Sequence, residues 1–291
     1  MTVAVLLIIG AGAGWGVLRA LLPMVNDAGT MTRTNYRGQA IPVVGGIPML
    51  AVTVAGLCAI NFLRSLTDLE VLPGESSRVL SPLAILILVT GLFGLVDDAF
   101  GTPAAKGIRG HLRALARGKL TSGMVKLLTG LLAALTVAST LESSVGWVSL
   151  GTLTVASWVN VGNLLDLGPG RAFKGCIPVA IALILCFPDE LAPVALLVGA
   201  AVGVVRADLR ERVMLGDSGA NPMGALVGFS ALASGNHVVL VAFLAVGLAL
   251  NIAAEFVSFS QVITAVPALR RLDLFGATEE RADFMRRHRQ Q

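Results

Sequence analysis

Four aspartates stand where apolar segments of the chain end or begin. Asp97 and Asp98 are adjacent and close one segment, Asp166 closes another, and Asp217 precedes a third. An α-helix carries about half a negative charge at its C-terminus, so carboxylates at such ends are unfavourable unless a cation compensates them. Mg²⁺ takes hard oxygen ligands and usually binds one or two carboxylates together with a substrate phosphate. The four aspartates therefore predict a divalent-cation site, with Mg²⁺ as the best fit.

The residues beside two of these aspartates strengthen this prediction. In Asn160-Val-Gly-Asn163-Leu-Leu-Asp166, two amides share a helix face with the acid. In Leu215-Gly216-Asp217-Ser218-Gly219-Ala220-Asn221-Pro222, the glycines permit close backbone approach to a ligand. We expect Asn221 to cap a helix that begins at Pro222, which leaves Asp217 free beside an anion-binding helix N-terminus. An isolated Asp usually only marks the end of a span, but that does not explain the adjacent pair or these sequences.

The composition indicates that lipid is the main solvent of the elements that carry these residues. Of the 291 residues, 55% are hydrophobic and 14% are charged, whereas soluble domains carry about 25% charged residues. The mean hydropathy is +0.81. The three cysteines lie in apolar runs without paired spacing, so the sequence supports neither a disulfide framework nor a zinc site.

Apolar segments long enough to matter in a membrane recur along the whole chain. They predict an all-α, polytopic membrane protein with about nine transmembrane helices in a single integral membrane domain, residues 1–291. The two short segments, 175–188 and 222–234, are also compatible with re-entrant helices. The predicted segments are 3–24, 44–63, 79–96, 122–140, 147–165, 175–188, 190–205, 222–234 and 236–257.

The distribution of basic residues predicts the orientation. With the N-terminus outside and the C-terminus cytoplasmic, the cytoplasmic segments hold 18 Lys and Arg, and the outer loops hold only Arg64 and Arg78. This is the asymmetry of the positive-inside rule, and it places all four aspartates at the cytoplasmic face. The net charge of +4 thus reflects orientation and contact with membrane lipids, and indicates no nucleic acid. The predicted cytoplasmic segments are 26–43, 97–121, 166–174, 206–221 and the tail 258–291.

Several of these motifs, in this order, resemble those of the polyprenyl-phosphate N-acetylhexosamine-1-phosphate transferase superfamily, which includes phospho-N-acetylmuramoyl-pentapeptide transferase. The resemblance runs from about residue 35 to 265. It rests on Gly45-Gly46-Ile47-Pro48, Asp97-Asp98, Lys106-Gly107-Ile108, Asn160-x-x-Asn163-Leu-x-Asp166, Gly216-Asp217-Ser218-Gly219 and Glu255-x-x-Ser258.

The resemblance implies a Mg²⁺-dependent enzyme of the bacterial cytoplasmic membrane that works in cell-envelope glycan synthesis. It would transfer a sugar-1-phosphate from a nucleotide sugar to polyprenyl (undecaprenyl) phosphate. Asp217 would ligate the metal, and Asp97 and Asp98 would position or deprotonate the lipid phosphate or supply a second ligand. Which of that pair contacts the metal stays open, as does a homodimer. Asp166 would complete the catalytic residues, and Lys106, Asn160 and Asn163 would bind the substrate.

The chain departs from the family pattern after Asp166. The family often continues with Gly-x-Asp-Gly, whereas this chain has Leu167-Gly168-Pro169-Gly170-Arg171 and lacks both a His-rich loop and a tenth span. We expect Arg171 to bind phosphate in place of the missing acid. Two alternatives remain: a membrane transporter, which the clustering of acids at one face disfavours, and a substrate-binding relative that has lost catalysis.

Overall fold

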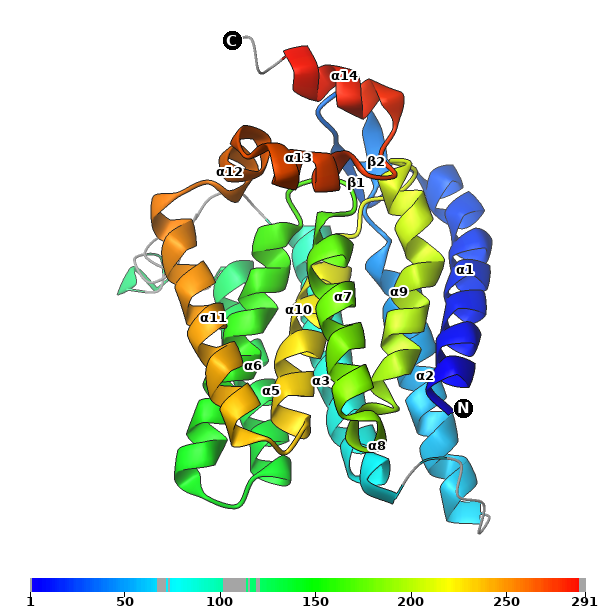
Figure 1. The fold of residues 1–291 in the computed structure, drawn as a ribbon. Helices are drawn as coiled ribbons and strands as arrows, with labels where there is room; N and C mark the ends of the chain where they lie inside the picture. Colours follow the sequence, from blue (N-terminus) through cyan, green and yellow to red (C-terminus); the bar gives the residue numbers. More distant parts are fainter. Residues whose placement is uncertain are drawn as a thin grey trace.

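The computed structural model describes residues 2–66, 72, 74–101, 114, 116–118 and 121–287. The chain forms a bundle of long helices with a short hairpin and a helical tail at one end (Figure 1). The long helices are α1 (Thr2–Ala28), α2 (Gly46–Leu66), α3 (Leu80–Phe100), α5 (Ser122–Leu141), α6 (Val145–Leu165), α7 (Arg171–Cys186), α9 (Val194–Leu209), α10 (Asp217–Ala233) and α11 (His237–Phe256). The shorter elements are η1 (Gly74–Val79), α8 (Pro188–Leu191), α12 (Phe259–Ala265), α13 (Pro267–Leu274), α14 (Glu279–Arg287), β1 (Thr32–Thr34) and β2 (Ala40–Pro42).

The fold is that of an all-α membrane protein, as predicted. Each predicted apolar segment is helical. Within the described part of the chain, six helical stretches are long and apolar enough to cross a bilayer: Thr2–Ala28, Gly46–Leu66, Glu75–Phe100, Ser122–Leu141, Val145–Leu165 and His237–Phe256. Three other long helices, α7, α9 and α10, have only 16, 16 and 17 residues, about 25 Å of helix each at 1.5 Å per residue.

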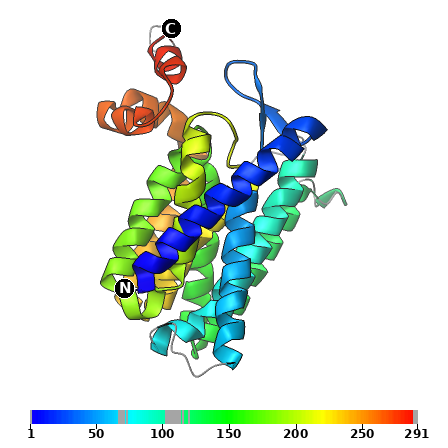
Figure 2. The same ribbon diagram turned by 90° about the vertical axis from the view of Figure 1, so that its right-hand side faces the viewer.

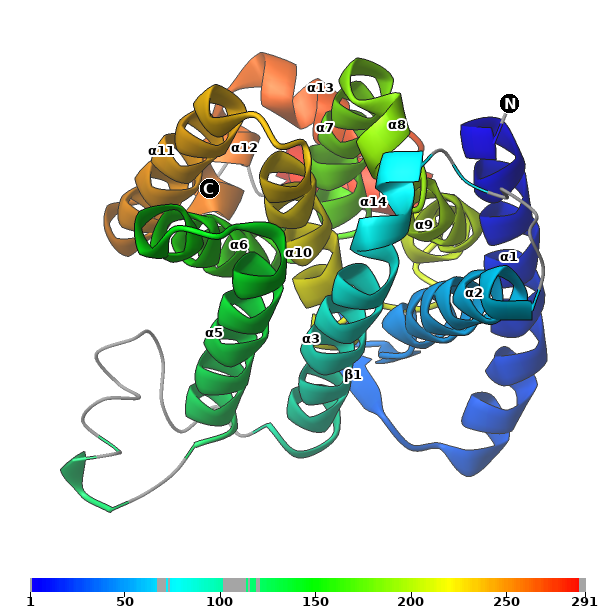
Figure 3. The same ribbon diagram turned by 90° about the horizontal axis from the view of Figure 1, so that it is seen from below.

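Helix α10 occupies the centre of the bundle, and all of its residues are buried (Figure 3). Its small side chains allow neighbouring backbones to approach closely. A Cβ added at Gly224 would lie 2.0 Å from the carbonyl oxygen of Trp158, and one at Gly162 would lie 2.2 Å from that of Ala220. These contacts hold α6 against α10 and fix where Asn163 meets the first turn of α10.

The segment that follows α1 forms a small antiparallel sheet, which the sequence analysis did not anticipate. Thr32 pairs with Pro42 and Thr34 with Ala40, and the turn is closed by the Asn35 side chain, which accepts from the backbone N–H groups of Arg37 and Gln39. A parallel bridge between Val43 and Met214 then joins this segment to the loop before α10.

The tail lies across the end of the bundle at which α10 begins (Figure 1). Helices α12 and α13 run across the ends of α6 and α7, and α14 lies beside the tip of the hairpin (Figure 2). The N-terminal end of α1 is at the opposite end of the bundle (Figure 2). The predicted loop 97–121 is described only at 97–101, 114, 116–118 and 121, so Lys106 lies outside the described residues.

Candidate functional site

Four helices deliver polar side chains to one point near the start of α10. The ammonium group of Lys126, on α5, contacts the carboxylate of Asp217 directly and lies 3.7 Å from Oδ2 of Asp97. With its amide turned to satisfy both neighbours, Asn163 accepts from Lys126 Nζ at 2.7 Å and donates to Asp217 Oδ1 at 3.3 Å. The side chains of Lys126, Asp97 and Asp217 are only 11–19% exposed. We call Asp97, Lys126, Asn163 and Asp217 the Lys126 cluster.

Asp98 has a different structural role from its neighbour Asp97. Its Oδ1 accepts from the backbone N–H of Asp217 at 3.0 Å, and its Oδ2 accepts from that of Ser218 at 2.9 Å. The Asp98 side chain has no exposed surface, and Arg33 lies 3.4 Å from Oδ1. A carboxylate at a helix N-terminus satisfies free N–H groups and interacts favourably with the helix dipole. Asp98 therefore caps α10 from α3.

This cap corrects the predicted start of α10. We expected Asn221 to cap a helix beginning at Pro222, but α10 begins at Asp217, after Gly216 at φ 70°. Asn221 lies inside the helix, buried, and neither atom of its amide has a hydrogen-bond partner. A cap supplied by a side chain 119 residues away cannot be read from the local sequence.

Gly216 makes this arrangement sterically feasible. Its positive φ is a conformation that residues with a Cβ rarely adopt. A Cβ at this position would also lie 2.6 Å from Asp98 Oδ2 and 2.5 Å from a methyl group of Val43. The glycine before Asp217 thus serves the cap and the docking of the hairpin segment.

A cavity of about 280 Å³ adjoins the Lys126 cluster beneath the hairpin and the tail. Its lining carries two cations, Arg33 and Arg281, and also Tyr36 and the acids Asp166, Asp208 and Glu211. Asp166 is the C-cap of α6. Loss of solvent and the nearby charges of Asp208 and Asp217 raise its pKa well above the usual value.

Asp208 is part of the wall that shapes this cavity. Its carboxylate accepts from the backbone N–H of Gly170 at 2.5 Å and from that of Leu215 at 3.0 Å. Desolvation raises its pKa to about 6, although these hydrogen bonds oppose the rise. Asp208 therefore ties the loops before α7 and α10 together.

Two residues predicted to bind substrate have partners within the protein. Arg171 is buried, and its guanidinium binds both carboxylate oxygens of Asp273, at 2.7 and 3.1 Å, and the hydroxyl of Ser260 at 2.7 Å. These contacts fasten Arg171 to the tail, and its predicted phosphate-binding role stays a prediction. Asn160 donates to Asn251 Oδ1 at 2.5 Å, so it joins α6 to α11, while Asn163 alone of the two asparagines reaches the Lys126 cluster.

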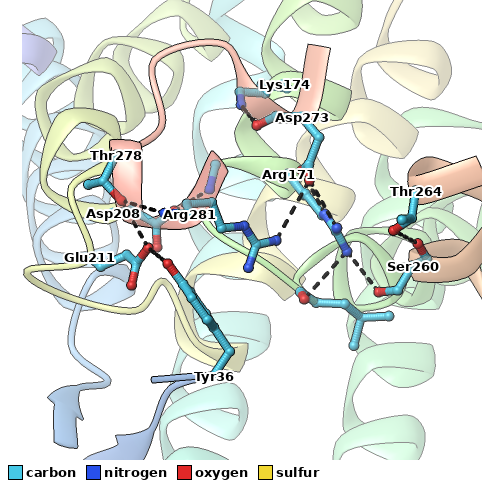
Figure 4. A network of polar contacts seen from close by, with 12 residues as sticks. Tyr36, Arg171, Lys174, Asp208, Glu211, Ser260, Thr264, Asp273, Thr278 and Arg281 are labelled. Atoms are coloured by element: carbon cyan, nitrogen blue, oxygen red, sulfur yellow. Dashed lines mark hydrogen bonds and ion pairs between the residues drawn. The ribbon is translucent and has the colours of Figure 1, made fainter. Parts of the chain in front are cut away.

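The contacts of Arg171 belong to a larger set that fastens the tail to the bundle (Figure 4). Arg281 lies 3.6 Å from Asp273, and Lys174 donates to the Asp273 carbonyl oxygen at 2.6 Å. Glu211 accepts from Tyr36 Oη at 2.6 Å, from Arg37 at 3.0 Å and from Asn35 at 3.0 Å. The guanidinium of Arg281 lies 5.0 Å from the centre of the Tyr36 ring. We call Tyr36, Arg171, Lys174, Glu211, Asp273 and Arg281 the tail network.

Lys126, the central cation of the site, was not among the predicted site residues. The signal was nevertheless present, because Lys126 lies more than one turn inside Ser122–Leu141, and a charged residue within a membrane helix is a functional candidate by default. Arg33, Asp208 and Glu211 were missed for another reason. They lie in a short strand, at a helix end and in a loop, and no local motif reports that these three positions are close in space.

The Lys126 cluster presents oxygen donors of the kind that Mg²⁺ prefers. Two carboxylates and one amide oxygen converge on a single positive charge, and hard oxygen ligands of this kind suit Mg²⁺. Among the residues that the structure describes, no three His, Cys, Asp or Glu side chains form a metal-binding group. The protein thus offers two carboxylates, the number with which Mg²⁺ usually binds alongside substrate phosphates and water.

No protein-family model and no curated protein sequence matches this chain.

Proposed function

We propose that this chain is a Mg²⁺-dependent glycosyl-1-phosphate transferase of the polyprenyl-phosphate N-acetylhexosamine-1-phosphate transferase superfamily. One observation carries the proposal. Asp97, Asn163 and Asp217, each from a separate motif, gather around one cation at one end of a bundle of apolar helices. Such a site suits a reaction between two phosphate-bearing substrates, one of which stays in the membrane.

The proposed topology has nine spans, with the N-terminus outside and the site at the cytoplasmic face. Helices occupy most of each of the nine predicted segments, and the start of α1 and helix α14 lie at opposite ends of the bundle, which is consistent with an odd number of crossings (Figure 1). The end that carries the Lys126 cluster also carries Arg33, Arg171 and Arg281, which agrees with the positive-inside rule.

Asp217 and Asp97 are the residues that would hold Mg²⁺, with the Asn163 oxygen beside them. When bound, the metal would neutralise phosphate charge and align the reacting groups. Lys126 holds the two carboxylates together, and competition with a divalent cation would free its ammonium group to bind a phosphate oxygen. Asp98 would act by fixing Asp217 at the first position of α10.

The reaction needs no dedicated base. An oxygen of the lipid phosphate forms a bond to the β-phosphorus of the nucleotide sugar, and the bond from that phosphorus to the bridging oxygen breaks. The nucleoside monophosphate leaves with the bond's electron pair. The second pKa of a phosphate monoester is about 6, so the attacking group is largely ionised near neutral pH. Catalysis then depends on charge neutralisation and alignment.

The neighbouring cavity is where we place part of the nucleotide. Its volume of about 280 Å³ is near the lower limit of typical ligand pockets, roughly 300 Å³, so it would hold a base or a ribose. Arg33 and Arg281 line it, and their charges would favour the diphosphate. Asp166 would contact the sugar or ribose hydroxyls, which can donate to its carboxylate oxygens.

The test is an assay of the purified protein with undecaprenyl phosphate, Mg²⁺ and a panel of UDP-, CDP- and GDP-sugars. We expect Mg²⁺-dependent release of UMP, CMP or GMP from one donor class, and no release by the Asp217→Asn variant. Mg²⁺-dependent nucleotide binding without release would indicate a non-catalytic relative. If the chain shows neither binding nor release with any donor, the proposal is wrong.

A further inference from the structure

A second and larger cavity lies away from the Lys126 cluster, between the second half of α1 and the C-terminal end of α9. Its volume is about 750 Å³, and it shares no lining residue with the cavity beneath the tail. Its polar lining consists mainly of Arg19, Arg206, Arg210 and Arg212, with Asp27 as the only acid.

The crossing of two glycine-rich helices creates this cavity. Cβ atoms added at Gly199 and Gly203 would lie 2.3 Å and 2.4 Å from the carbonyl oxygens of Leu7 and Ala11, so α1 and α9 touch backbone to backbone there. Such small-residue contacts impose a crossing angle on membrane helices. Past the contact, α1 runs obliquely away from α9 and towards α2 (Figure 2). Of the arginines of the cavity, Arg206, Arg210 and Arg212 lie where α9 ends and the loop before α10 begins.

The four arginines leave the cavity with a strong excess of positive charge. Within the described part of the chain, none of them forms an ion pair with an acid, whereas Arg37, Arg171 and Arg281 all do. The guanidinium of Arg19 makes a cation-π contact, 5.3 Å from the centre of the Trp15 ring. The charge is therefore available to an anion from outside the protein.

The rest of the lining is apolar. Leu18, Leu22 and Pro23 come from α1, and Gly203 and Ala207 come from α9. Trp15, which is 54% exposed, lies one turn deeper on a membrane helix, as an aromatic at the edge of the hydrocarbon region would. A ligand that fills this cavity needs a negative head near the arginines and a hydrocarbon part along α1.

We infer that this cavity binds an anionic diacyl phospholipid of the leaflet that faces the Lys126 cluster. Basic pockets between transmembrane helices on the cytoplasmic side recognise anionic headgroups in this way. A soluble phosphate would use the arginines but not the apolar wall, and a zwitterionic lipid would use the wall but leave the four charges uncompensated. The inference does not depend on the proposed transferase activity.

Lipid binding to the full-length protein can be measured by native mass spectrometry and by the shift of its melting temperature in neutral detergent. The probes are phosphatidylglycerol, phosphatidylcholine with the same acyl chains, and inorganic phosphate. We expect phosphatidylglycerol to bind at least about tenfold more tightly than phosphatidylcholine, since each nearby Lys or Arg contributes to anionic-lipid binding. Inorganic phosphate should neither stabilise the protein nor displace the lipid.

The deciding variant is Arg206→Gln/Arg210→Gln, which removes two charges from one face of α9. It should reduce phosphatidylglycerol binding by roughly tenfold or more and leave phosphatidylcholine binding unchanged. The matched control is Arg270→Gln/Arg271→Gln, which removes two charges from α13, outside the cavity. Equal binding by both variants would overturn the inference. Full displacement of the lipid by inorganic phosphate would also overturn it, because the cavity would then be a site for soluble anions.

Discussion

The Lys126 cluster and the tail network lie at the same end of the molecule but differ in how completely their charges are satisfied. In the tail network, Arg171 uses all three guanidinium nitrogens, and Asp273 is shared by Arg171 and Arg281. In the Lys126 cluster, one ammonium group serves two carboxylates, which leaves one negative charge in excess. In the tail network the cations outnumber the acids by three to two, so an excess of negative charge that favours a further cation is found in the Lys126 cluster and not in the tail network. This difference separates scaffold from site.

Asp217→Asn should produce the largest effect on activity. An amide of the same size keeps the shape of the site but removes a charge that would bind the metal, so Mg²⁺-dependent transfer should fall by roughly 10³-fold, equivalent to several kcal/mol. The protein should still accumulate in the membrane and melt as the wild type does. Asp189→Asn, at the other end of the bundle in α8, is the control and should retain activity. Normal transfer by Asp217→Asn would remove the distinction between the two regions.

Asp273→Asn should have the largest effect on stability. Removing one partner of a buried ion pair leaves the other charge uncompensated and lowers the free energy of unfolding by about 3 kcal/mol. In this variant the uncompensated charges are those of Arg171 and Arg281. The tail should become sensitive to limited proteolysis before the bundle melts. The control is Asp283→Asn in the same tail, because the Asp283–Arg286 pair is exposed and such pairs contribute about 0–1 kcal/mol. Equal protection of the tail in both variants would show that Asp273 does not fasten it.

Asp98→Asn and Asp97→Asn should separate two adjacent residues. In Asp98→Asn, the introduced amide can accept one backbone hydrogen bond with its single carbonyl oxygen, and the interaction with the helix dipole is lost. The loss should be about 1–2 kcal/mol of stability, with part of the activity retained. Asp97→Asn should lower activity more than stability. Thermal melting and the transfer assay on both variants check this, and the reverse ranking would mean that the cap is not the main role of Asp98.

Lys126→Gln tests whether the lysine competes with Mg²⁺ for the two carboxylates of the Lys126 cluster. Without the ammonium group, Mg²⁺ no longer competes for Asp97 and Asp217, so the Mg²⁺ concentration for half-maximal activity should fall by about tenfold, equivalent to about 1.4 kcal/mol. The maximal rate should also fall, because the phosphate loses a cationic partner. A higher Mg²⁺ requirement in Lys126→Gln would show that the lysine assists metal binding instead of competing with it.

The smallest effect concerns the pH dependence of the tail network. Desolvation, together with the hydrogen bond to Glu211 and its charge, raises the pKa of Tyr36 to about 12. The folded protein therefore favours the neutral phenol more strongly than the unfolded chain does, because the pKa of tyrosine in the unfolded chain is near 10. The stabilisation is complete below pH 10 and is lost as the pH rises towards 12.

Tyr36 is the only tyrosine in the chain, so tyrosinate absorbance reports its ionisation directly, with Tyr36→Phe as the blank. Asp217→Asn should leave this titration unchanged, since the Lys126 cluster makes no contact with Tyr36. A midpoint near pH 10 would mean that Glu211 does not hold the phenol.

The sequence predicted the helices well because hydrophobic length is a local property. It also predicted that Asp217, Asp97 and Asn163 would meet, because motif order and span count together place them at one face. It did not predict what Asp98 does. From the sequence, Asp98 stands at the unfavourable C-terminal end of α3, whereas in the structure the same carboxylate faces the N-terminus of α10. The compensating charge is another helix dipole, whose position depends on tertiary packing.

The partner of Arg171 could not be predicted from the local sequence either. Its position after Asp166 suggested a ligand for phosphate, but its partner Asp273 lies 102 residues later, in a tail whose path over the bundle is not encoded nearby. The hairpin was missed because its strands have only three residues each and gain stability from their contact with the loop before α10. Local sequence patterns therefore predict secondary-structure elements, whereas the role of a charged residue depends on partners that lie far along the chain.

The complete burial of α10 has a consequence for how the protein is made. Every residue of α10 is buried, and this helix of 17 residues is not among the stretches that are both long and apolar enough to cross a bilayer. This helix is synthesised after α1–α9 and before α11, yet it occupies the centre of the bundle. Its glycines pack against the backbone of α6, so we expect its final position to depend on contacts with neighbouring helices as well as on partitioning into lipid. The earlier helices would then form an open assembly that α10 closes.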